Sequence, residues 1–175
     1  MRSRQLLSQK QRLEWLIKQA STFRGDQLEL QAHWARYLCV LAAGFLENSL
    51  SEVYSRYAKG CANAQVANYV EAVLAKVQNP KSDKFLDTAR AFDRSWEEDL
   101  RAFILENGRK DAIDAIMANR HQIAHGKDSG ISLARIQQYL GKRSHPPPFF
   151  YAAAGIAGSG GSSRPLRAAR MTVPR

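Results

Sequence analysis

The sequence predicts an all-α protein, an irregular helical bundle with a long central helix and short accessory helices. Through most of the first 141 residues, apolar residues recur at spacings of three, four and seven, the period of a core-facing helix. No stretch shows the alternation of apolar and polar residues that is typical of a half-buried strand. With 175 residues, 45% of them hydrophobic, the chain is long enough for one domain with a core and too short for two.

The first two helices are expected over residues 6–23 and from Asp26 to Gly60. The second runs for over thirty residues without a proline and reaches a glycine, which is typical of a helix end. This length predicts the central helix of the bundle, with Gly44 as the place where it can kink. The first helix has one apolar stripe, formed by Leu6, Leu13, Leu16, Ile17 and Ala20.

Two further helices follow. Asn63 is a suitable N-cap for the third helix, which is expected to close before Pro80 because the residue before a proline disfavours the helical conformation. A short fourth helix is predicted over residues 82–93.

The remaining helices have clear end signals. Ser95 stands three residues before Glu98, as in a capping box, and Gly108 lies just past the end of that helix. A further helix is expected from about Arg109, and a last short one after Ser132.

The amino-acid composition changes at about Gly141. Residues 1–141 are expected to form the helical domain, and residues 142–175 a Pro/Gly/Ser-rich basic tail without helical periodicity, predicted to be disordered. The composition suits a basic arm and equally a segment foreign to the protein, so no function is assigned to it.

The net charge of +10 is unevenly distributed. The tail holds six basic and no acidic residues, which leaves 20 basic against 16 acidic residues in 1–141. Charge therefore permits RNA binding without arguing strongly for it. The longest apolar run, Tyr37–Leu46, is far shorter than the roughly 20 residues of a membrane span, and no signal-peptide pattern opens the chain. A soluble, cytoplasmic protein is expected, with Cys39 and Cys61 as reduced thiols in or near the core.

The stretch NRHQIAHG, residues 119–126, ends the helix that begins near Arg109. With about 100° per residue, Arg120 falls in the middle of an apolar face. An unpaired buried arginine would cost about 3–5 kcal/mol, so an anion is expected to meet it. The apolar face is made of Ile113, Ile116, Met117 and Ala124.

Two kinds of anion fit Arg120. One is a carboxylate of the central helix, Glu47 or Glu52, in an ion pair that orients the bundle. The other is a phosphate, whose geometry the guanidinium matches with two parallel hydrogen bonds.

The neighbouring histidines favour the phosphate. His121 and His125 stand four residues apart on the flank of the same face, and Gly126 offers a natural helix end. A zinc site is the weaker alternative, because Gln122 occupies the place of a metalloprotease glutamate and no third ligand follows. Metal-free cleavage of RNA needs a base for the 2′-hydroxyl, an acid for the leaving oxygen and a cation on the phosphate, which histidines and an arginine supply.

These residues resemble the R-x4-H motif of the HEPN superfamily (higher eukaryotes and prokaryotes nucleotide-binding). Arg120 matches the arginine, His121 the polar position and His125 the final histidine of RHQIAHG. The nearest branch is the RiboL-PSP-like or MAE-type HEPN proteins, in which a helix similar to LAAGFLENSLSEVYSRYA precedes the motif. The resemblance covers residues 109–126 most strongly and about 28–60 more weakly, and it stops at Gly141.

The resemblance implies a metal-independent endoribonuclease without a cofactor, of the kind found in toxin–antitoxin and phage-defence systems. It also implies a homodimer whose two motifs form one composite cleft. This suits the geometry, because Arg120 and His125 lie about 140° apart on an ideal helix. The resemblance further implies that His125 transfers protons, that Arg120 binds the transition-state phosphate and that His121 positions the substrate.

Three residues are weaker candidates for the site. Glu47 is the carboxylate that would hold Arg120 in place, while Asn119 and Lys127 flank the motif and would touch the RNA backbone. Lys127 also departs from the toxins paired with a nucleotidyltransferase antitoxin, which carry a modifiable tyrosine there. An antitoxin or defence-locus partner would therefore be of another type. The rival interpretation is a non-catalytic HEPN-like module that dimerises or binds RNA or a nucleotide.

Overall fold

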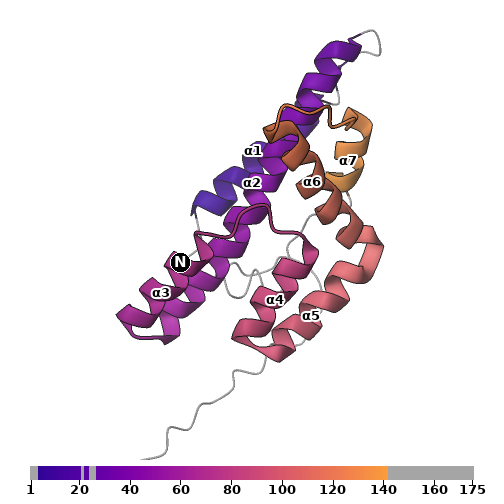
Figure 1. The fold of residues 1–175 in the computed structure, drawn as a ribbon. Coiled ribbons are helices and arrows are strands. Elements are labelled where there is room, and N and C mark those ends of the chain that lie inside the picture. Colours follow the sequence, from indigo (N-terminus) through magenta and orange to yellow (C-terminus); the bar gives the residue numbers. More distant parts are fainter. Residues whose placement is uncertain (1–3, 21, 24–26, 142–175) are drawn as a thin grey trace, which may run out of the picture.

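A computed structural model describes residues 4–20, 22–23 and 27–141, and these residues form helices and connecting turns without a strand (Figure 1). The all-α prediction is confirmed. The predicted tail, residues 142–175, lies outside the described residues. The elements are α1 (Arg4–Ala20), α2 (Leu28–Cys61), α3 (Ala64–Leu74), α4 (Ser82–Phe92), α5 (Arg94–Leu105), a 3-10 turn η1 (Glu106–Gly108), α6 (Arg109–Ala124) and α7 (Leu133–Gly141).

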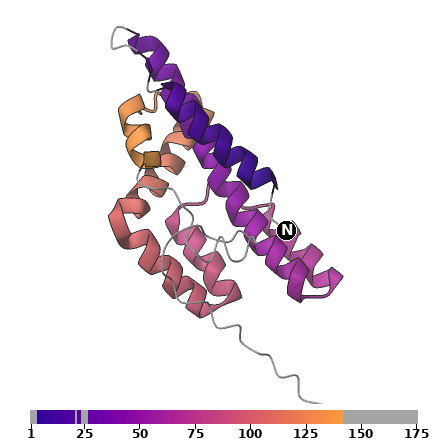
Figure 2. The ribbon, with the colours of Figure 1, turned by 180° about the vertical axis from the view of Figure 1, so that it is seen from behind.

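The long helix α2 is the axis of the molecule. It runs unbroken for 34 residues, so Gly44 does not interrupt it. In Figures 1 and 2, α3 folds back along its C-terminal end, α1 lies along it on one side, and α6 and α7 pack on its N-terminal half from another. The helices α4 and α5 form a hairpin beside α6.

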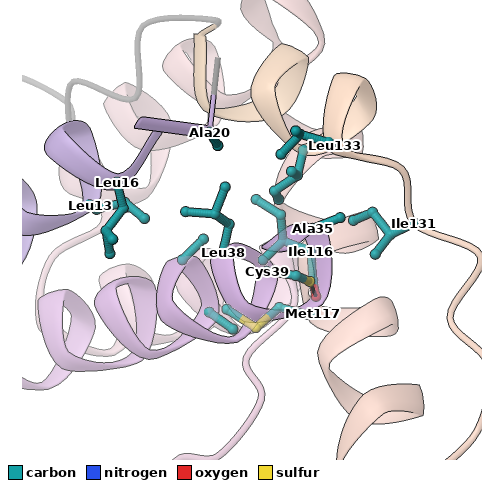
Figure 3. Close-up of a cluster of buried hydrophobic side chains, with 13 residues drawn as sticks. Leu13, Leu16, Ala20, Ala35, Leu38, Cys39, Ile116, Met117, Ile131 and Leu133 are labelled. Atoms are coloured by element: carbon teal, nitrogen blue, oxygen red, sulfur yellow. Dashed lines mark hydrogen bonds between the residues drawn. The ribbon is translucent and has the colours of Figure 1, made fainter. Parts of the chain in front are cut away.

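Two apolar clusters hold the helices together. The first joins α1, α2, α6 and α7 around Leu38, Met117 and Ile136, which are fully buried (Figure 3). The second joins α2 to α3, α4 and α5 around Tyr54 and Leu100. Each fully buried side chain of this size contributes about 1.5–3 kcal/mol by leaving water. Since α2 contributes to both clusters, it joins the two halves of the bundle.

Several predicted helix ends are wrong by a residue or a turn. Gly60 lies inside the last turn of α2, which ends at Cys61. The backbone becomes extended at Ala62 and Asn63, which connect α2 to α3. The N-cap of α5 is Asp93 and not Ser95, since the Asp93 carboxylate accepts hydrogen bonds from both the backbone N–H and the hydroxyl of Ser95. The cap predicted for α3 is confirmed, because Asn63 accepts from the Val66 N–H at 2.9 Å.

The helix α3 also ends early, at Leu74, six residues before Pro80. Backbone bonds to residues three positions back, from Lys76 and Val77, tighten the chain into a turn there. The turn lets Pro80 enter the protein interior and brings Asn79, with φ of 49°, against α2.

Both cysteines are free thiols, but only Cys39 belongs to the core. Burial raises the pKa of Cys39 to about 11, and its Sγ lies 3.5 Å from the Ile116 carbonyl oxygen. Cys61 is exposed, so the expectation of two core or near-core thiols is wrong for it. None of the described helices combines the length and the hydropathy that a membrane span requires.

Candidate functional site

The candidate site lies at the C-terminal end of α6, which closes with a Schellman motif. The Lys127 N–H donates to the Gln122 carbonyl at 2.9 Å, and the Gly126 N–H donates to the Ile123 carbonyl at 3.1 Å. Gly126 has φ of 66°, a left-handed conformation that a residue without Cβ adopts most readily. The prediction that Gly126 ends this helix is confirmed, and His125 becomes the C-cap.

The two histidines form an exposed pair. The ring centroids of His121 and His125 are 4.4 Å apart, with the ring planes inclined by 64°. Both side chains are open to solvent, so a ligand can reach them without a rearrangement of the core. Across the described parts of the chain, no three His, Cys, Asp or Glu side chains gather closely enough to hold a metal ion.

Arg120 points away from this pair and toward α2. Its Nη2 lies 3.9 Å from Oε1 of Glu47, and the two side chains are 32% and 20% exposed. Of the two carboxylates considered from the sequence, Glu47 therefore faces Arg120, while Glu52 accepts from Arg56 at 2.9 Å. At 3.9 Å the pair is an ion pair without a direct hydrogen bond, and a third of the arginine side chain stays accessible.

Glu47 has a second and shorter contact. Its Oε1 accepts a hydrogen bond from the Asn79 N–H at 2.5 Å, in the turn between α3 and α4. The carboxylate thus ties that turn to α2 while it faces the motif arginine. Sequence reasoning missed this role, although the Asn79-Pro80 pair indicated a turn at that point.

Asp114, two turns before the motif in α6, fixes the start of α4. Its carboxylate accepts from the Ser82 N–H at 2.7 Å and from the Ser82 hydroxyl at 2.9 Å, and it pairs with Lys110 at 2.8 Å. Burial favours the neutral acid, but the hydrogen bonds from Lys110 and Ser82 outweigh it, so the pKa of Asp114 is lowered. Through this contact and that of Glu47, α2, α4 and α6 are held in one arrangement around the motif.

The other candidates lie at the edge of the site. The Asn119 side chain donates to the Ala115 carbonyl of its own helix at 2.8 Å, which holds its amide against α6. Lys127 is exposed. Ala124, expected on the buried face, is exposed because Ile123 packs against the core in the last turn instead.

A further contact beside the motif was not anticipated. Asp128, two residues after Gly126, lies 3.5 Å from Nη2 of Arg36 on α2. The same Oδ1 accepts from the Gly130 N–H at 3.2 Å, which orders the loop that follows the motif. No feature of the sequence marks this pair, because charged residues 92 positions apart give no local pattern.

In one chain, then, the structure brings the motif residues together as two separate pairs. His121 and His125 meet on the outer flank of α6, and Arg120 meets Glu47 on the side that faces α2. A histidine pair can give and take protons, and an accessible guanidinium can bind a phosphate. Within one chain, the histidines and the arginine therefore belong to separate pairs.

The model of the RiboL-PSP-HEPN family matches residues 5–142. No match was found among curated proteins or among solved structures.

Proposed function

The chain belongs to the RiboL-PSP-HEPN family, and from this premise we propose that it is a metal-independent endoribonuclease that acts through Arg120, His121 and His125. The observation that carries the proposal is the exposed histidine pair at the end of α6, with its rings 4.4 Å apart, next to an arginine that is one-third exposed. RNA is the proposed substrate, and no cofactor is needed.

In the proposed reaction, the 2′-hydroxyl of a ribose attacks the neighbouring phosphate. His125 takes or gives the proton, and Arg120 stabilises the charge that develops on the phosphate oxygens. His121, in ring contact with His125, orients it and contacts the substrate. Lys127 and Asn119 flank the motif and are the residues proposed to touch the RNA backbone.

The proposed active form is a homodimer. On an ideal helix Arg120 and His125 would lie about 140° apart, and such a spacing does not direct both toward a single phosphate from one copy. A two-fold partner supplies the missing group and lets two copies of His125 divide the base and acid roles. The α2 surface next to Glu47 supports such an approach, because Val40 is 41% exposed there and a Cβ at Gly44 would meet no atom within 4 Å.

A toxin–antitoxin or phage-defence setting in the cytoplasm is proposed with this activity, together with an antitoxin or other partner from the same locus. Lys127 stands where the nucleotidyltransferase-paired toxins carry a tyrosine. We therefore do not propose that an antitoxin neutralises this protein by modifying that position. The second candidate function is a non-catalytic RNA-binding or dimerisation module. It is favoured by the Glu47 ion pair, which occupies Arg120 within the single chain.

The test is cleavage of a mixed RNA pool in EDTA by the wild type, His125→Ala and Arg120→Ala. His33→Ala is the matched control, since His33 is an exposed histidine on α2 that pairs only loosely with Glu29 at 3.9 Å. We expect 2′,3′-cyclic phosphate ends from the wild type and the control, and at least a hundredfold loss in both motif variants.

Three outcomes would change the proposal. A folded, dimeric wild type that binds RNA without cleaving it would support the non-catalytic module. Loss of all cleavage in EDTA would revive a metal site at the histidine pair. Cleavage by a wild type that stays monomeric at working concentration would remove the composite cleft and place all groups on one chain.

A further inference from the structure

The positive charge of the described helices is concentrated on α1. This helix contains four basic residues and one acidic residue, a net charge of +3. Residues 21–141 contain 15 basic and 15 acidic residues, so apart from Arg2 the whole excess of the helical domain lies on α1. A single helix with this excess is an electrostatic footprint for a polyanion.

The cations of α1 alternate with an aromatic ring on its outer face. Arg12, Trp15 and Lys18 follow one another at steps of three residues, which makes them neighbours on the helix surface. All three are exposed, and Trp15 is 59% exposed. The opposite face of α1 is the buried one, formed by Leu6, Leu13, Leu16 and Ala20. We refer to Arg12, Trp15 and Lys18 as the α1 stripe.

A second aromatic ring lies beside the α1 stripe. Nη2 of Arg12 donates to the hydroxyl of Tyr37 on α2 at 3.1 Å, and Tyr37 is 41% exposed. The Tyr37 ring also packs edge-on against Trp34, with centroids 5.9 Å apart, which holds it in place. Arg12 uses one of its five N–H donors in this contact, so the others remain for a ligand.

The cations of the stripe lack acidic partners. The one carboxylate of α1, Glu14, pairs with Lys10 on the flank of the helix at 3.6 Å. Among residues 4–20, 22–23 and 27–141, no ion pair joins Arg12 or Lys18 to a carboxylate. Because Glu14 pairs with Lys10, Arg12 and Lys18 are left as cations of α1 that can attract an anion.

We propose that the α1 stripe and Tyr37 form a binding site for single-stranded RNA. This site is separate from the motif at the end of α6. Trp15 stacks on a base, and Arg12 and Lys18 contact the flanking phosphates; both kinds of contact tolerate any sequence. Arg4 extends the basic surface to about 21 Å along the helix axis, at 1.5 Å per residue. In Figure 2 α1 is the foremost helix, on the face of α2 turned away from the viewer in Figure 1.

This inference rests on the proposed function for the choice of RNA, and it adds a second place, outside the motif, that holds the strand. A nuclease that holds its substrate at two points selects long unpaired strands over short ones, because the second contact acts at high effective concentration.

The test is binding of a fluorescent 20-nucleotide 2′-O-methyl oligouridine, which cannot be cleaved because its 2′-hydroxyls are blocked. Trp15→Ala is expected to weaken binding about tenfold, and Lys18→Gln to reduce the slope of log affinity against log salt by about 0.7. Two controls match these changes. Tyr69→Ala removes another exposed ring, on α3 (71% exposed), and Lys59→Gln removes the same charge from α2, where Lys59 pairs with Glu71 at 2.8 Å. Both are expected to bind within twofold of the wild type.

The outcomes separate this inference from the proposed nuclease. Equal weakening by Trp15→Ala and Tyr69→Ala, or by Lys18→Gln and Lys59→Gln, would overturn the α1 site even if the wild type cleaves RNA. A wild type that does not cleave, but whose binding falls with Trp15→Ala and not with the controls, would support the α1 site alone. Dissociation of a dimer by Trp15→Ala would overturn it, because the stripe would then be a protein interface.

Discussion

Glu47 has two contacts that substitutions can separate. Glu47→Gln keeps an oxygen for the Asn79 N–H at 2.5 Å but removes the charge that faces Arg120 at 3.9 Å, whereas Glu47→Ala removes both. A hydrogen bond to a charged group contributes about 1.5–3 kcal/mol, a neutral one about 0.5–1.5 kcal/mol, and a partly exposed ion pair about 0.2–1 kcal/mol. We therefore expect Glu47→Gln to cost about 1 kcal/mol of unfolding free energy and Glu47→Ala about 2–3 kcal/mol.

The assay is urea unfolding of both variants at pH 7 and low salt, with Glu52→Gln and Glu52→Ala as controls. Glu52 belongs to the same helix and pairs with Arg56, four residues on, with a side chain that is 36% exposed. Such a pair is worth about 0.3–0.5 kcal/mol, so the two controls should differ little. If Glu47→Gln cost as much as Glu47→Ala, the charge facing Arg120, rather than the Asn79 hydrogen bond, would carry the stabilisation, and the reasoning would be refuted.

Two further predictions concern groups outside the site. Hydrogen bonds from Arg90 and Arg101 lower the pKa of Glu97, so the stability that they supply is present above the ordinary glutamate pKa and is lost as the pH falls through the lowered value. Between about pH 5 and pH 3, the melting temperature of the wild type should fall more steeply than that of Glu97→Gln, and parallel curves would contradict this. At pH 8, a thiol reagent should modify exposed Cys61 rapidly and Cys39 only after unfolding, because burial raises the pKa of Cys39 to about 11; two fast thiols in the native protein would show that Cys39 is accessible.

Much of the fold follows from local rules. The apolar stripe of α1, the proline-free length of α2 and the Asn63 cap each predict an element that the structure contains. The errors occur where two local signals compete. Ser95 has the capping-box pattern, yet Asp93, two residues earlier, caps α5, and Glu98 pairs with Arg94 at 3.7 Å instead of turning back to the cap. A sequence pattern that tests one position at a time cannot decide which of two nearby residues will be the N-cap.

The candidate site was predictable in part, and the reason differs between its residues. The cost of burying a charge predicts an anion for Arg120, and Glu47 is the carboxylate that faces it, although the Arg120 side chain is only partly buried. The contact of Glu47 with Asn79 and that of Arg36 with Asp128 join residues 32 and 92 positions apart. Such contacts depend on how the helices cross, which hydrophobic periodicity does not determine.

The position of Arg120 bears on the mechanism. An arginine without a partner on a helix end would sample many rotamers, whereas the Glu47 carboxylate at 3.9 Å restricts it while a third of the side chain stays accessible. In the proposed nuclease, an RNA phosphate that displaces this weak ion pair offers the guanidinium two short hydrogen bonds in exchange for one long electrostatic contact. Glu47 stays fixed by the Asn79 N–H during that exchange, so the carboxylate does not become an unpaired buried charge. The same residue can therefore orient Arg120 before binding and release it to the substrate.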